Sequence, residues 1–117
     1  MLDIPKMLPQ AVYSRRRNGR VQLNETVYAF WSCQGRDGLS RIRDIACSGL
    51  FIETAATFNV GTRVGLHFLI KEGQIRADAV IRHVRYGRGL GLKFVAINEQ
   101  DWERFSAFTK RVRQAIP

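Results

Sequence analysis

Four arginines stand within six residues near the start of the chain, at Arg15, Arg16, Arg17 and Arg20. Their planar guanidinium groups suit bidentate contacts to phosphate and to the O6 and N7 atoms of guanine. Neighbouring cations repel one another and gain little from water-exposed positions when no anion is present. The cluster therefore predicts an anion-binding segment, and a solvated basic arm is the other interpretation of the same composition.

A second polar group, Asp44-Ile45-Ala46-Cys47-Ser48-Gly49, closes one expected strand and opens the next. An ionised carboxylate can accept two hydrogen bonds, from the N1 and N2 donors of guanine. An Asp at a strand end can also cap a turn, and a glycine can supply an unusual backbone angle. Together with the arginines, these residues fit a ligand that offers phosphate, a Hoogsteen edge and a Watson–Crick edge.

The other reactive side chains form no recognisable catalytic or metal site. Cys33, Cys47, His67 and His83 lack the closely spaced ligand pairs of structural zinc sites, so we interpret them as free thiols and ordinary histidines. The sequence contains no nucleophile elbow, no acidic metal cluster and no His–carboxylate pair at useful spacing. We therefore predict that the protein is not an enzyme and holds no metal or cofactor.

Length and charge favour one soluble domain with an anionic partner. The chain has 117 residues, and 19 Lys and Arg stand against 10 Asp and Glu, for a net charge of +9. The longest apolar run is about four residues, far short of the roughly 20 that cross a bilayer, which predicts no membrane insertion. The N-terminus lacks the order of a secretory signal, so we expect a cytoplasmic protein.

The hydrophobic pattern predicts strands followed by one helix. Residues 1–14 show no sustained periodicity, and Pro5 and Pro9 interrupt any regular element, so we expect a flexible lead-in and a domain over residues 15–117. Short alternating segments separated by glycine-bearing turns, including one at 35–38 with Asp37-Gly38 at positive φ, predict an antiparallel barrel or sandwich. The six strands are expected to begin near Val21, Leu39, Leu50, Val64, Ile75 and Leu90.

The last twenty residues have the pattern of an amphipathic helix packed on the sheet. Asn98 is a good N-cap, with acidic residues after it and basic residues near the end. One stripe carries the apolar side chains Trp102, Phe105, Phe108, Val112 and Ile116.

The spacing of the two polar groups resembles a known family. Arg16-x-x-x-Arg20 followed by Asp44-x-x-x-x-Gly49 is similar to the RxxxR and (D/N)xSxxG signatures of PilZ domains. The similarity continues through residues 61–64, 89–94 and the terminal helix, and it covers about residues 13–112. The order, spacing and shared barrel context of these motifs make the combination specific. The resemblance implies a mainly β fold, a six-stranded antiparallel PilZ-type β-barrel with a C-terminal α-helix.

The resemblance also implies a ligand, cyclic di-GMP, which such domains often receive as an intercalated dimer on one outer face. By position, Arg16 and Arg20 would grip guanine edges and phosphates, and Arg15 or Arg17 would assist.

In the second motif, Asp44 would hold a guanine and Gly49 would permit close backbone approach. The family's Ser is replaced by Ala46, which removes one expected hydroxyl contact. Affinity and stoichiometry for the ligand therefore stay open, as do the oligomeric state and the downstream partner.

Three functions follow from these residues. The first is a cyclic di-GMP receptor or adaptor that signals in trans to an unidentified effector protein. The second, motivated by Ala46, is a degenerate PilZ scaffold that binds proteins but no nucleotide. The third is a single-stranded nucleic-acid barrel, which the charge favours and the core-like spacing of most aromatics disfavours.

Overall fold

The computed structural model describes the backbone of residues 5–7 and the whole of residues 21–114. This part of the chain contains eight strands, one 3₁₀ helix and one α-helix. The elements are β1 (Pro5–Met7), β2 (Val21–Gln22), β3 (Tyr28–Cys33), β4 (Arg36–Ala46), β5 (Gly49–Glu53), β6 (Arg63–Ile70), β7 (Gly73–Arg85), β8 (Gly89–Asn98), η3 (Glu99–Asp101) and α1 (Trp102–Gln114).

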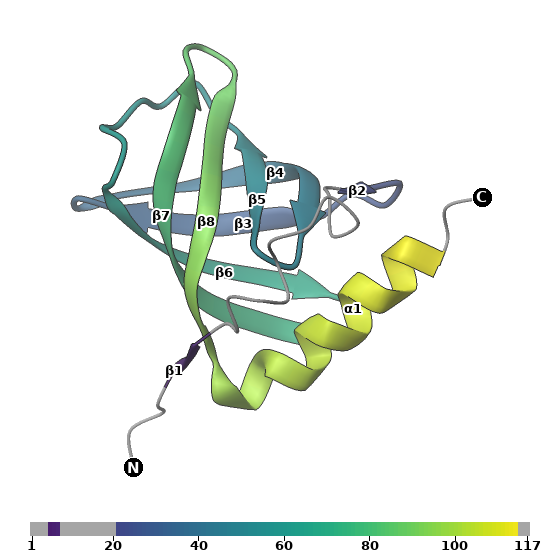
Figure 1. Ribbon diagram of the computed structural model, residues 1–117. Helices are drawn as coiled ribbons and strands as arrows, with labels where there is room; N and C mark the ends of the chain where they lie inside the picture. Colours follow the sequence, from purple (N-terminus) through teal and green to yellow (C-terminus); the bar gives the residue numbers. More distant parts are fainter. Residues whose placement is uncertain (1–4, 8–20, 115–117) are drawn as a thin grey trace.

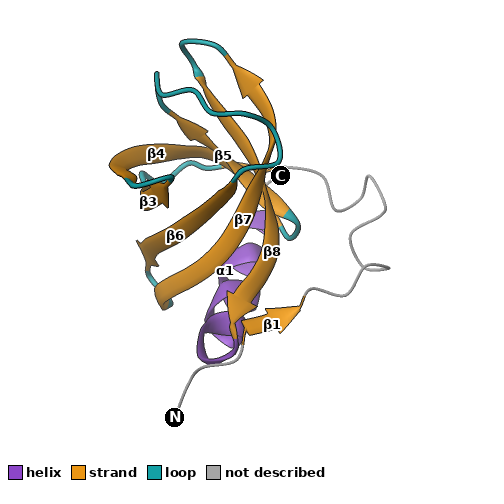
Figure 2. Ribbon diagram, turned by 90° about the vertical axis from the view of Figure 1, so that its left-hand side faces the viewer, coloured by secondary structure: helices purple, strands orange, loops and turns teal. Residues whose placement is uncertain are grey.

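The long strands β3 to β8 close into a barrel. The order along the sheet is β1-β8-β5-β4-β3-β6-β7, the pairing of β7 with β8 closes the circle, and β2 pairs with β4. Every pairing is antiparallel. The helix α1 follows the barrel and lies against it (Figures 1 and 2). The predicted six-stranded antiparallel barrel with a C-terminal helix is therefore confirmed.

The core forms because alternate side chains of each strand point inward. In β6, Val64, Leu66, Phe68 and Ile70 are buried, whereas the residues between them are exposed or half-buried. Phe68 and Phe94 meet Phe105 of α1 edge to face, with ring centroids 6.4 and 5.2 Å apart. The helix therefore completes the same core that the strands enclose.

Two local features differ from the sequence prediction. The turn between β3 and β4 uses Gln34 and Gly35, with φ of 51° and 78°, and not Asp37-Gly38. A two-residue turn with positive φ at both positions matches the twist of a hairpin, and it leaves residues 36–38 free to pair with β3 as part of β4. The apolar alternation that begins at Val21 is also divided between β2 and β3.

The start of the helical region is built around polar contacts. The Asn98 side chain accepts a hydrogen bond from the backbone N–H of Gln100 at 3.0 Å, as its predicted N-cap role requires, and η3 precedes α1. Asp101 is fully buried; it accepts from the backbone N–H of Arg76 at 2.9 Å and pairs with Arg104.

The N-terminal segment contributes one strand to the described structure. Pro5–Met7 pairs with Asn98, Ile97 and Ala96 of β8, which the sequence pattern did not predict for a lead-in. The division into residues 1–14 and 15–117 otherwise stays a prediction, and the expected stripe residue Ile116 lies outside the described residues.

Candidate functional site

Asp44 lies on the outside of the barrel because β4 contains a bulge. The register between β4 and β5 shifts between Ile42 and Asp44, and Ile42 and Ile45 are both buried in the core. Two residues, Arg43 and Asp44, therefore stand between inward-facing neighbours, as a bulge allows. The register places Asp44 directly opposite Phe51 of β5.

Arg43 and Phe51 make a layered contact beside the Asp44 carboxylate. The Arg43 Nε lies 3.1 Å from Asp44 Oδ2, and the Arg43 guanidinium carbon lies 4.0 Å from the centre of the Phe51 ring. Arg85 approaches the same ring at 5.4 Å, and the His83 ring stacks on it with centroids 6.1 Å apart. This group, which we call the Phe51 layer, consists of Arg43, Phe51, His83 and Arg85. The Phe51 ring is only 2% exposed, so the surface next to the carboxylate is formed by the two guanidinium groups and the His83 ring that cover it.

The Phe51 layer depends on a glycine in β8. Gly91 pairs with Phe51 on one side and with His83 on the other. A Cβ at Gly91 would overlap the His83 ring, so glycine lets that ring lie against the backbone of β8. Sequence reasoning favoured an exposed strand histidine at His83, with a place on the ligand face as the other interpretation, and it missed Arg43, Phe51 and Arg85. The one available signal was an aromatic side chain at an outward position of β5, two residues after Gly49.

Gly49 has a role inside the fold. A Cβ at this position would overlap the carbonyl oxygen of Leu92, so glycine permits β5 to approach β8. The backbone N–H of Phe94 donates to the Ser48 carbonyl at 2.8 Å and fixes the same turn. Ala46, which pairs with Gly49, is only 5% exposed. The approach of a ligand backbone to Gly49 stays a prediction.

The remaining expected site residues lie elsewhere or outside the structure. Arg15, Arg16, Arg17 and Arg20 lie outside the described residues, between residues 7 and 21. In the described part, Cys33 and Cys47 are free thiols, and burial raises the pKa of the Cys33 thiol.

Neither a metal cluster nor a membrane span is found in residues 21–114. No three side chains of His, Cys, Asp or Glu gather there as metal ligands would. The described helix is too short and too polar to cross a bilayer.

The comparison with protein families decides the classification. The model for the PilZ domain matches residues 14–111, which span both the arginine cluster and the Asp44 motif. The chain belongs to the PilZ domain family. Asp44 and Gly49, which the motif pairs, thus flank the turn between the bulged strand β4 and β5 of a PilZ barrel.

Solved structures with the same barrel are distant in sequence. The inhibitor of motility of Bacillus subtilis, MotI/DgrA, has 17% identity and a TM-score of 0.72, and the match covers 87% of this chain and 54% of that one. MrkH of K. pneumonia in complex with c-di-GMP has 19% identity and a TM-score of 0.68, with coverage of 86% and 52%. PlzA of Borreliella burgdorferi in complex with c-di-GMP has 14% identity, a TM-score of 0.51 and coverage of 93% and 40%.

The PilZ domain described here spans about half the length of the MotI and MrkH chains that it matches. No curated protein matches it in sequence.

Proposed function

We propose that this PilZ-domain protein is a receptor for cyclic di-GMP, which binds on the outer face formed by β4, β5 and β7. The observation that carries the proposal is the position of Asp44, a carboxylate held at the edge of the Phe51 layer. Membership of the PilZ family supports it, as do the complexes of MrkH and PlzA with c-di-GMP.

The chemistry of this face suits a guanine nucleotide. The carboxylate of Asp44 can accept hydrogen bonds from N1 and N2 of guanine. The guanidinium groups and the His83 ring that cover Phe51 give the base a flat cationic surface on which to stack. Arg16 and Arg20, assisted by Arg15 or Arg17, would supply phosphate and Hoogsteen contacts from the preceding segment.

Binding at this face would act through a partner protein. Ordering the arginine segment against the barrel costs conformational entropy, which several charge-assisted hydrogen bonds offset. The ordered segment and the Phe51 layer would then form a new surface, and an unidentified effector recognises it. In this role the protein is a cytoplasmic binding module and not an enzyme.

The experiment that tests the site compares two arginines of the same barrel. Arg43→Ala removes the guanidinium between Asp44 and Phe51, whereas Arg63→Ala removes an exposed arginine of β6 that makes no ion pair within residues 21–114. A charge-assisted contact is worth ~1.5–3 kcal/mol, so Arg43→Ala should weaken cyclic di-GMP about tenfold or more in calorimetry. Equal affinities of the two variants for cyclic di-GMP would show that the Phe51 layer is not part of the binding site.

Ala46 supports a second candidate, a PilZ scaffold that binds proteins without the nucleotide. The side chain that stands where the family has a hydroxyl is a methyl group, 5% exposed. Calorimetry with the unmodified protein separates the two, since a scaffold gives no heat of binding with cyclic di-GMP.

A further inference from the structure

An apolar patch lies on the outside of the barrel, over β3, β4 and β6. Tyr28 and Phe30 of β3, Leu39 of β4 and Leu69 of β6 are 52%, 47%, 67% and 71% exposed. The register puts Phe30 directly between Leu39 and His67, and Tyr28 lies two residues before Phe30 on the same face. We call these four side chains the Phe30 face. Contiguous exposed apolar side chains of this kind mark interaction surfaces.

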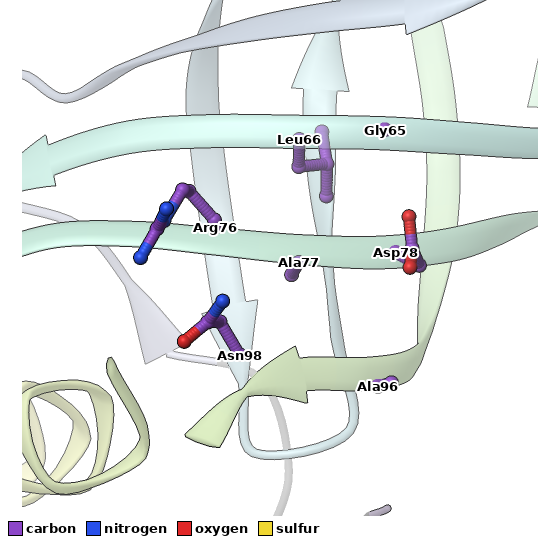
Figure 3. Close-up of a pocket in the computed structure, with 7 residues that line it drawn as sticks. All are labelled: Gly65, Leu66, Arg76, Ala77, Asp78, Ala96 and Asn98. Carbon is purple, nitrogen blue, oxygen red and sulfur yellow. The ribbon is translucent and has the colours of Figure 1, made fainter. Parts of the chain in front are cut away.

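A hollow of about 270 Å³ adjoins the Phe30 face over β6, β7 and β8. Figure 3 shows Gly65 of β6 beside Asp78 of β7 and Ala96 of β8 around it. Gly65 pairs with both Ser32 and Asp78, so the hollow is one step along the strands from Phe30 and His67. A Cβ at Gly65 would come no closer than 4.0 Å to another atom. The fold therefore does not require glycine at position 65. Because Gly65 has no side chain, the hollow has room for a side chain from another molecule.

The two sides of the Phe30 face carry opposite charges. Asp37 of β4 lies on the side of Gly65 and accepts a hydrogen bond from the Ser32 hydroxyl at 2.8 Å. Arg41 of β4 lies on the other side, opposite Tyr28, and forms no ion pair within residues 21–114. Asp37 and Arg41 are both exposed and stand on the same strand, two residues on either side of Leu39.

These three features make the surface complementary to itself. A symmetric dimer uses the same patch on both copies. If two copies meet face to face about a two-fold axis along the row Leu39–Phe30–His67, each residue on one side of that row faces a residue from the other side of the partner's row. Leu69 then lies over the partner's Gly65, because both residues are two positions from His67 on β6. Arg41 lies over the partner's Asp37 for the same reason on β4. In this arrangement the exposed Leu69 side chain enters the partner's hollow at Gly65, and the guanidinium of Arg41 faces the partner's carboxylate.

We propose that the Phe30 face binds a second copy of this chain. A single-stranded nucleic acid fits it less well, because Asp37 and Asp78 would face phosphates and two of the four apolar side chains are aliphatic and offer no ring for stacking. An apolar segment of another protein has no reason to match Leu69 with Gly65 and Arg41 with Asp37. The proposal does not rest on nucleotide binding, since the Phe30 face shares no residue with Asp44 and the Phe51 layer.

Sedimentation equilibrium of the full chain at about 0.15 M salt tests the proposal, because salt screens the repulsion between two copies of net charge +9. The unmodified chain should associate to a dimer with a dissociation constant in about the micromolar range. Gly65→Val fills the hollow with a residue that favours strands, so it should raise the dissociation constant about tenfold or more without lowering the unfolding temperature. Val60→Ala, at an exposed apolar residue outside the face, is the matched control and should leave the dimer unchanged.

Charge reversal gives a second, independent readout. Asp37→Arg and Arg41→Asp should each weaken the dimer, because each places like charges opposite one another. The double variant restores opposite charges and should return the dissociation constant to within about threefold of the original.

Three results would overturn the proposal. The first is an unmodified chain that stays monomeric up to about 500 µM, and the second is a double variant as weak as either single one. The third is a monomeric chain that binds an oligonucleotide through the Phe30 face, with an affinity that Gly65→Val lowers.

Discussion

The Asp44 side chain is only 12% exposed and keeps the Arg43 guanidinium at 3.1 Å. A buried carboxylate is tolerated when a charged partner or hydrogen bonds compensate its lost hydration. The same contact fixes the direction of the carboxylate relative to the Phe51 ring, which the guanidinium also covers. Asp44 therefore belongs to a preassembled group, and its role as a ligand contact can be tested separately from its role in the fold.

The first prediction distinguishes these two roles with a pair of ligands. Asp44→Ala should weaken cyclic di-GMP more than it weakens an analogue whose guanines lack the N2 amine, because the second hydrogen bond of the carboxylate is made to that amine. Isothermal calorimetry of both proteins with both ligands measures the difference. Equal losses for the two ligands would leave Asp44 as a structural residue only.

The second prediction concerns the missing hydroxyl. Ala46→Ser should tighten the binding of cyclic di-GMP by roughly two- to tenfold, because a single neutral hydrogen bond contributes ~0.5–1.5 kcal/mol net. The change adds one small atom at a position of low exposure, so the unfolding temperature serves as the control for packing. If neither the unmodified chain nor Ala46→Ser binds, the receptor proposal fails and the scaffold is the better account.

At the scale of elements, one arginine ties the helix to two loops of the barrel. Arg111 of α1 donates from Nη1 to Glu25 Oε2 at 2.6 Å and from Nε to Glu72 Oε2 at 2.6 Å. Glu25 lies between β2 and β3, and Glu72 lies in the turn between β6 and β7. The hydrogen bonds from Arg111 lower the pKa of both carboxyl groups, and those carboxylates raise the pKa of Arg111.

The third prediction follows from the direction of these shifts. A carboxyl group whose pKa is depressed in the folded state stabilises the fold above its unfolded pKa, 4.5 for Glu, and loses that contribution as pH falls through the folded value. Arg111→Gln should therefore cost about 1 kcal/mol near neutral pH, and the cost should shrink as the pH falls from about 6 to about 3.

Thermal unfolding of the two proteins across that pH range measures the effect. Lys110→Gln, at an exposed neighbouring position of α1, is the control for the loss of one positive charge. A difference between the Arg111 variant and the unmodified chain that stays constant with pH would show that the carboxylates do not contribute.

At the scale of the whole molecule, the sequence predicted what depends on local patterns. The alternation Val64, Leu66, Phe68, Ile70 defines a strand without knowledge of its partners, and Asn98 marks the start of the helical region by its own capping chemistry. Many such segments predicted an antiparallel barrel or sandwich, and the resemblance to the PilZ family selected the barrel. The family motif located Asp44 and Gly49 in one connected unit.

The parts that could not be predicted depend on pairing between strands. The bulge at Arg43 is defined by the pairing with β5, because Ile42 pairs with Ile52 and the next pair is Asp44 with Phe51. The sequence of β4 alone does not show it. The Phe51 layer needs Gly91 of β8 to be adjacent, which only the register reveals. The Phe30 face likewise joins residues of the β3–β4 hairpin to Leu69 of β6, a strand that lies far from that hairpin in the chain.

The measurement that tests the central claim most directly is calorimetry of the unmodified chain with cyclic di-GMP, GTP and a short single-stranded oligonucleotide, repeated with an Arg16→Ala/Arg20→Ala variant. We predict binding of cyclic di-GMP with a dissociation constant in about the micromolar range or below, at least tenfold tighter than for GTP or the oligonucleotide. The variant should lose most of this affinity, about tenfold or more, and keep its fold, because both arginines precede the first strand of the barrel. No binding of cyclic di-GMP, or equal affinity for all three ligands, would contradict the account.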